Sequence, residues 1–70
     1  MMSEIRLSLN GQLIQVPDNA SLQSMLESQQ IAPDSVALVR AGEVVPKSQW
    51  ALTLCEAGDV IELFGVVAGG

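Results

Sequence analysis

The segment EIRLSLNGQLIQV, residues 4–16, determines how the fold begins. Its first half alternates apolar with polar residues, and this period of two predicts a half-buried strand. Asn10-Gly11 follows, and this pair favours a type I′ hairpin turn because both residues tolerate a positive φ. Residues 12–16 then predict the returning strand, which Pro17 ends. The chain is therefore expected to open with an antiparallel hairpin that has one apolar face.

After the hairpin, the apolar residues change to a helical period. Leu22 begins a stripe at positions i, i+3 and i+4 that ends at Leu26. Ser21 is the predicted N-cap, with Asn19 as the alternative, and the helix is expected to end at residue 29 or 30. A helix this short needs tertiary packing for its stability, so we expect it to cover the apolar face of the hairpin.

The rest of the chain predicts three further strands and no second long helix. The strands are expected at residues 36–40, 43–45 and 60–66, with a loop at 33–35, a turn at 41–42, a helical turn at 47–50, an ambiguous segment at 51–54 and a turn at 56–59. The order β-β-α-β-β-β predicts an α+β fold in which one helix covers one face of the sheet, while the other face meets solvent or a partner. We expect one domain over residues 1–66 and a flexible tail over 67–70.

Composition and charge restrict the class of function. The net charge is −5, from eight acidic and three basic residues, which argues against nucleic acid and against an anionic membrane surface as partners. The same charge fits either a partner with a basic surface or a role in solubility alone. With one cysteine and no histidine, the chain has neither a disulfide nor a zinc cluster. The sequence shows no signal peptide and no membrane span, and we expect a cytoplasmic protein.

The last predicted strand, VIELFGV at residues 60–66, has one face that carries a charge. Glu62 without a partner is not expected to point into a core, so Phe64 and Val66 should share its outward face. An outward aromatic residue next to the C-terminal segment predicts a docking surface for a partner. The alternative is that Phe64 folds back over the edge of the sheet or is covered by a loop.

The chain ends in FGVVAGG, and its last two residues have no use in packing. Glycines without Cβ atoms allow the segment Val67, Ala68, Gly69 and Gly70 to enter a narrow channel in a partner enzyme. A plain carboxylate is a poor acyl donor, but a partner that uses ATP can convert the Gly70 carboxylate to an acyl adenylate. Attack by a sulfur nucleophile then gives a thiocarboxylate, and attack by a lysine gives a protein conjugate.

Three segments together resemble the ThiS family, the sulfur carrier proteins of thiamine biosynthesis. They are GEVVPKSQW at 42–50, EAGDVIELF at 56–64 and VAGG at 67–70, and the resemblance covers nearly the whole chain. It implies a ubiquitin-like β-grasp fold: a mixed five-stranded sheet that grips one helix, with the first and last strands adjacent and parallel at its centre. It also implies that Gly70 is the modified residue. With the outward face of the last strand, this predicts that residues 66–69, Phe64 and Glu62 bind the partners.

The resemblance further implies the partners of the chain and its role as a cosubstrate rather than an enzyme. A ThiF-type adenylyltransferase would use ATP to adenylate Gly70, and the chain itself would bind no cofactor and no metal. Sulfur would come from cysteine through a donor such as a cysteine desulfurase system, and a ThiG-type thiazole synthase would receive it. We expect the free chain to be a monomer. Two positions depart from the family: Ala41 stands where Asn is frequent, and Lys47 stands where Arg is usual.

Other functions are weighed against this one. The small subunit of molybdopterin synthase has the same fold and tail, but those chains tend to be longer and to carry prolines before the terminal residues. A ubiquitin-like modifier that is conjugated to lysines usually contains several lysines, whereas Lys47 stands alone here. An interaction module with an idle tail would tolerate deletion of Gly70. A β-grasp ferredoxin is excluded because its cluster needs four cysteines.

Several single residues have predicted structural roles. Cys55 has no basic neighbour in sequence and is expected to be a buried structural thiol. Trp50 is expected to cover a small core under the 47–50 turn rather than to anchor a partner. Asp59 should stabilise the turn before the last strand through its side chain. Arg6 and Arg40 are expected to be solvated at the surface, with the border of the docking face as the alternative.

Overall fold

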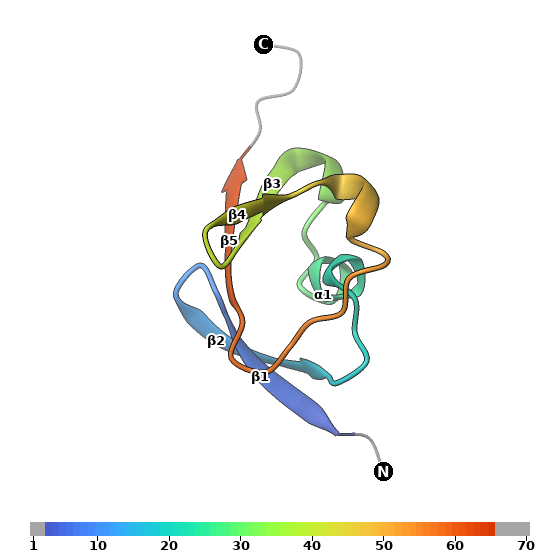
Figure 1. Cartoon of the computed structure of the whole chain (residues 1–70), viewed down its shortest axis with the longest axis vertical. Coiled ribbons are helices and arrows are strands. Elements are labelled where there is room, and N and C mark those ends of the chain that lie inside the picture. The colour runs from blue at the N-terminus through green and yellow to red at the C-terminus, as the bar shows by residue number, and fades with distance from the viewer. Residues whose placement is uncertain (1–2, 66–70) are drawn as a thin grey trace.

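The computed structural model describes residues 3–65 of the chain, and Figure 1 shows their arrangement. The elements in chain order are β1 Glu4–Leu9, β2 Gln12–Pro17, α1 Leu22–Ser28, the 3-10 turn η1 Pro33–Ser35, β3 Val36–Arg40, β4 Glu43–Val45, the 3-10 turn η2 Lys47–Gln49 and β5 Val60–Gly65. The predicted order of strands and helix is confirmed. Residues 33–35, which the sequence predicts as a loop, instead form η1, because Pro33 at its first position is already fixed near a helical φ.

The five strands form one mixed sheet in the order β2-β1-β5-β3-β4. β1 pairs antiparallel with β2 and parallel with β5, and β5 pairs antiparallel with β3. The first and last strands thus lie side by side in the middle of the sheet, and α1 crosses one face of it (Figure 1). This is the expected α+β fold of the β-grasp type.

Both tight turns between strands use the left-handed backbone conformation. Asn10 and Gly11 have φ values of 51° and 82° between β1 and β2, and Ala41 and Gly42 have φ values of 53° and 82° between β3 and β4. The two turns therefore have the same φ pattern, which is that of a type I′ hairpin. Asn tolerates this conformation, whereas Ala at position 41 places a Cβ atom against its backbone. The departure at Ala41 therefore has a conformational cost.

The ends of α1 are closed by side-chain and main-chain hydrogen bonds. Ser21 is the N-cap, as predicted, and its side-chain oxygen accepts from the Ser24 N–H at 3.0 Å. The helix ends at Ser28, slightly before the predicted end. Gln30 there adopts a φ of 60°, and the Ile31 N–H donates back to the carbonyl of Leu26 at 3.0 Å. This is a Schellman ending with Gln in the position that Gly usually takes.

The core lies between α1 and the sheet. Its buried side chains come from α1, from every strand except β4 and from the connecting segments: Leu7, Leu9, Val16, Ala20, Leu22, Met25, Leu26, Leu38, Trp50, Cys55 and Ile61. The helical stripe predicted from the sequence is fully buried, with no solvent exposure at Leu22, Met25 or Leu26. Neither α1 nor either 3-10 turn crosses the opposite face of the sheet (Figure 1).

The segment between η2 and β5 packs along the beginning of α1. The ambiguous residues 51–54 contain only a single bridge, Leu54 to Ser21. The Leu22 N–H donates to the Thr53 carbonyl at 2.9 Å, which fastens this segment to the helix. Trp50 is 2% exposed, and its indole Nε1–H donates to the Val45 carbonyl at 2.9 Å. Trp50 therefore covers the core, as predicted.

Candidate functional site: the open sheet face and the strand that leads to the C-terminal segment

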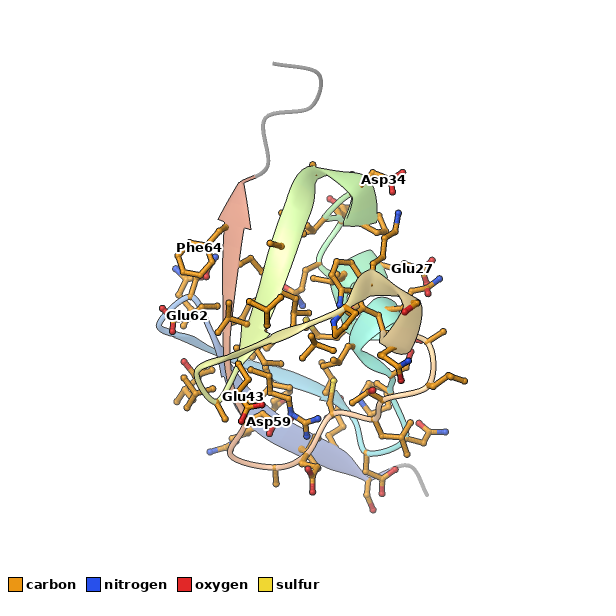
Figure 2. All side chains as sticks on the ribbon, turned by 45° about the horizontal axis from the view of Figure 1, so that its top comes forward. Glu27, Asp34, Glu43, Asp59, Glu62 and Phe64 are labelled. Atoms are coloured by element: carbon orange, nitrogen blue, oxygen red, sulfur yellow. The ribbon has the colours of Figure 1, made fainter. Side chains whose placement is uncertain are left out.

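The alternation predicted for β5 is confirmed in the structure. Ile61 is fully buried and Leu63 is half-buried, so both lie on the helix side. Glu62 and Phe64 are exposed on the other side, and 54% of the Phe64 surface meets solvent. Figure 2 shows both side chains projecting from the same side of β5, away from α1. At this exposure, Phe64 is not covered by a loop of residues 3–65.

Strand register places further apolar side chains on the same face as Phe64. Directly opposed residues in an antiparallel pair point to the same face. Ala37 lies opposite Phe64, and Val39 lies opposite both Glu62 and Val44. On the other side of β5, Ser8 lies opposite Leu13 and beside Val60. We call this surface the open face; its apolar members are Leu13, Ala37, Val39, Val44, Val60 and Phe64.

The sequence identified part of the open face and missed the rest. Val60 follows the same alternation as Glu62 and Phe64 but was not named as a site residue, and it is 55% exposed. Leu13 is 76% exposed, and the alternation of β2 carried that signal because Ile14 and Val16 point inward. Val44 is 69% exposed, but a strand as short as EVV has no alternation that could indicate its direction.

The two arginines differ in their positions. Arg6 is exposed on β1, next to the open face, which was the alternative considered for it. The prediction that Arg40 is solvated at the surface is wrong. Its side chain is only 18% exposed, and its guanidinium Nη2 lies 2.6 Å from Glu56 Oε1 and 3.1 Å from Asp59 Oδ2. The β3 register places Arg40 on the same side as buried Leu38, so it does not border the open face.

The turn before β5 is fixed by polar contacts. Asp59 Oδ2 accepts from the Glu56 N–H at 2.8 Å, which is the predicted role of this side chain. The same oxygen forms an ion pair with the Arg40 guanidinium, so the turn is bonded to β3 as well as within itself. Figure 2 shows Asp59 near Glu43, at the end of the sheet that carries the β3–β4 turn. These contacts fix the start of β5 relative to its neighbours.

Cys55 is a structural thiol, as predicted. It is 3% exposed, and its Sγ–H donates to the Ser21 carbonyl at 3.6 Å. Burial raises the pKa of the thiol, the Asp59 carboxylate raises it further, and the Arg40 guanidinium opposes them. A thiol with a raised pKa is a poor nucleophile at neutral pH, so Cys55 is not suited to accept sulfur.

Asn10 has a second role besides its turn. Its backbone N–H donates to the Ile61 carbonyl at 2.9 Å, and its side-chain Oδ1 accepts from the Leu63 N–H at 2.8 Å. The residue thereby continues the β1–β5 ladder by one step beyond the end of β1. Asn10 therefore anchors β5 close to the point where the strand leads into the C-terminal segment.

The remaining predicted site residues lie outside the described part of the chain. They are Val66, Val67, Ala68, Gly69 and Gly70.

Lys47, the second departure from the family pattern, forms an exposed ion pair with Asp34. Such a pair contributes little to stability, so Lys47 is free to exchange this partner for another.

Residues 3–65 contain neither a metal-binding cluster nor a helix that could span a membrane. This stretch contains no group of three His, Cys, Asp or Glu side chains that could hold a metal ion. Its helix is also too short to cross a bilayer.

A mixed five-stranded sheet with one helix across one face and a parallel central pair defines a β-grasp protein. The comparisons with known proteins are more specific. Residues 4–70 match the model of the ThiS family. A curated relative from Escherichia coli K12, named sulfur carrier protein ThiS, is 32% identical over 66 residues, which cover 94% of this chain and all of the relative. The chain belongs to the ThiS family.

A solved structure supports the fold independently. The crystal structure of the thiamine biosynthesis protein ThiS from Geobacter metallireducens matches with a TM-score of 0.81. The match covers 94% of this chain and all of that chain, at 23% sequence identity. The expected β-grasp fold is thus found in the family as well as in this chain.

Proposed function

We propose that this chain is a sulfur carrier that acts through the carboxylate of Gly70 in assembly of the thiamine thiazole ring. The observation that carries the proposal is the family match, which spans residues 4–70 and so includes the terminal VAGG. The Escherichia coli relative is itself named a sulfur carrier protein, which supports the same role.

The proposed chemistry has three steps on one carboxylate. A ThiF-type adenylyltransferase joins the Gly70 carboxylate to the AMP part of ATP, and pyrophosphate leaves. A sulfur nucleophile, supplied from cysteine by a desulfurase-type donor, then attacks the carbonyl carbon, and AMP leaves. The donor sulfur, carried as a persulfide, is then joined to Gly70 in an acyl disulfide. A thiol reductant attacks the donor-side sulfur, forms a disulfide with it and releases the Gly70 thiocarboxylate, from which a ThiG-type thiazole synthase takes the sulfur. In the first two steps this chain is the substrate of another enzyme.

The open face supplies a docking surface next to the reacting end. Phe64 stands one residue before the end of β5, and Val60 lies earlier on the same strand and the same face. An extended chain spans at most about 3.3–3.6 Å per residue, so residues 66–70 can reach no more than roughly 18 Å from the end of β5. An enzyme that binds the open face can therefore receive Gly70 in an enclosed active site. The net charge of −5 favours a basic docking surface on that enzyme.

The docking step is tested by a pair of alanine variants. Phe64→Ala removes the aromatic ring of the open face, while Leu52→Ala removes an apolar side chain that is 78% exposed outside the sheet. Because buried aromatic residues dominate interfaces, we expect Phe64→Ala to weaken binding to the adenylyltransferase by about tenfold. Leu52→Ala should bind like the wild type. Equal affinities of the two variants, measured by calorimetry, would contradict docking through this face.

The adenylation step is tested by release of pyrophosphate. The adenylyltransferase with ATP and the wild-type chain should release pyrophosphate in proportion to the amount of chain added. A variant that lacks Gly70 should bind through the open face but release none. Release that is equal for both chains would show that Gly70 is not the adenylated residue.

A further inference from the structure

β5 continues past the end of its parallel neighbour. The register between β1 and β5 contains the pairs Ser8–Val60 and Leu9–Ile61, whereas the register between β3 and β5 continues as far as Gly65. Figure 1 shows the same arrangement, in which β5 runs on beyond the β1–β2 turn with β3 beside it. The last part of β5 therefore has a strand on one side only among residues 3–65.

Hydrogen bonds show which main-chain groups point to the free side. The N–H and C=O of one strand residue point to the same side, and successive residues alternate. The Ala41 N–H donates to the Val60 carbonyl at 3.1 Å, so the even-numbered residues of β5 face β3. The Ile61 carbonyl and the Leu63 N–H instead form hydrogen bonds with Asn10, which lies on the side of β1. By the same alternation, the Leu63 carbonyl and the Gly65 N–H also point away from β3.

Asn10 closes the ladder immediately before these two groups. Its backbone N–H donates to the Ile61 carbonyl, and its side-chain oxygen accepts from the Leu63 N–H. β1 has ended at Leu9, so no described strand of this chain reaches the Leu63 carbonyl or the Gly65 N–H. We call these two groups the free edge of β5. A free edge presents a donor and an acceptor to another main chain.

The space beside the free edge is open. Gly65 is exposed, and a Cβ atom built on it, which would point to the helix side of the sheet, would meet no heavy atom within 4 Å. Phe64 is the neighbouring residue and belongs to the open face, so the free edge is continuous with the proposed docking surface. A partner that covers Phe64 therefore also reaches the edge.

We propose that an extended main-chain segment of the activating adenylyltransferase pairs with the free edge of β5 and adds a short strand in line with β1. This inference rests on the proposed function. One residue of a strand parallel to β5 can donate to the Leu63 carbonyl and accept from the Gly65 N–H. Asn10 makes the equivalent contacts one step earlier, with Ile61 and Leu63. The added strand holds β5 up to Gly65 and so fixes the direction in which residues 66–70 enter the enzyme.

The enzyme fits this edge better than a second copy of the chain does. Two copies would each bring a net charge of −5 to the contact, which opposes their association. The free edge offers one donor and one acceptor, and hydrogen bonds as few as these are too weak to hold a dimer by themselves. The enzyme can also contact the open face and the C-terminal segment of this chain, which adds to the hydrogen bonds at the edge.

Gly65→Pro is the variant that tests the pairing, with Gly65→Ala as its matched control. Proline removes the Gly65 N–H, which the β3–β5 ladder does not use, and strand edges that face solvent tolerate it. Phe64 has the extended conformation that a residue before proline requires. We expect both variants to keep the circular dichroism spectrum of the wild type. Gly65→Pro should bind the adenylyltransferase about tenfold more weakly, since a buried acceptor of the enzyme loses its donor. Gly65→Ala should bind within about twofold.

Amide hydrogen exchange of the wild-type complex gives an independent readout. The Gly65 amide should exchange at least about tenfold more slowly when the adenylyltransferase is bound, as a newly hydrogen-bonded amide does. An unprotected Gly65 amide overturns the pairing, even if Gly65→Pro binds weakly. Unchanged binding by Gly65→Pro overturns it as well. A dimer of the free chain that Gly65→Pro abolishes would assign the edge to a second copy and overturn the enzyme as its occupant.

Adenylation of the wild-type chain in the same preparation separates this inference from the proposed function. Pyrophosphate release by the wild type, together with unchanged binding by Gly65→Pro, would leave the carrier function standing and overturn only the edge pairing. Failure of the wild type to bind or to be adenylated would overturn both.

Discussion

Replacement of Asn10 by glycine should weaken the link between the first hairpin and the last strand without disturbing the turn. Asn10 has a φ of 51°, which glycine adopts freely, so Asn10→Gly preserves the turn conformation. The variant does lose the side-chain oxygen that accepts from the Leu63 N–H at 2.8 Å. The change in stability therefore reports mainly on this hydrogen bond, which joins residues far apart in the sequence.

The expected magnitude follows from the exposure of the bond. It lies near the surface, so water can replace the lost acceptor, and the net contribution should be about 0.5–1.5 kcal/mol. In a domain of this size, a loss of about 1 kcal/mol lowers the melting temperature by roughly 4–8 °C. Thermal denaturation followed by circular dichroism measures this shift directly.

Asn10→Asp is the matched control because it keeps an oxygen acceptor at the same position. It should stay closer to the wild type in melting temperature than Asn10→Gly does. The Leu63 amide should exchange with solvent faster in Asn10→Gly than in Asn10→Asp. If Asn10→Gly melts at the wild-type temperature and leaves exchange at Leu63 unchanged, the proposed anchoring of β5 by Asn10 is refuted.

Three other substitutions test separate parts of the structure. Ala41→Asn should raise the free energy of unfolding by about 0.5–1 kcal/mol in urea denaturation, since Asn accepts the positive φ of this turn more readily; a loss of stability would contradict the assignment of the turn. Trp50→Phe should lower the free energy of unfolding by about 1–3 kcal/mol because the Val45 carbonyl loses its indole donor. An unchanged free energy of unfolding would show that water replaces this bond. For Cys55, the folded-state pKa is raised, so its contribution to stability is complete below the ordinary value of 9.0 and is lost as the pH rises above it. Cys55→Ala should flatten the alkaline part of a stability–pH curve, and an unaltered slope would contradict this reasoning.

Local patterns in the sequence were sufficient to predict most of the fold. The period-two alternation gave β1 and β5 with their correct faces, and the helical stripe with Ser21 as N-cap gave α1. Gly11 and Gly42 marked the two turns, since each supplies a positive φ. These signals succeed because they depend on neighbouring residues, whose spacing is fixed by the backbone.

Contacts between distant segments were beyond such patterns. The bond from Leu63 to Asn10 spans 53 residues, and nothing local to either residue indicates it. Arg40 was expected in solvent because its partner Glu56 comes 16 residues later, in a turn whose position depends on the whole sheet. The direction of Val44 likewise became clear only from the register between β3 and β4. The candidate site was therefore predicted at Glu62 and Phe64 of β5 and missed in its contributions from β2, β3 and β4.

The central claim is that Gly70 carries sulfur as a thiocarboxylate, and intact mass spectrometry tests it most directly. The chain would be incubated with ATP, a ThiF-type adenylyltransferase and a sulfide source, beside a variant that lacks Gly70. The account predicts a mass gain equal to the replacement of one oxygen by sulfur in the full chain and none in the variant. An unchanged mass of the full chain, with an enzyme that is active on another carrier, would contradict the account.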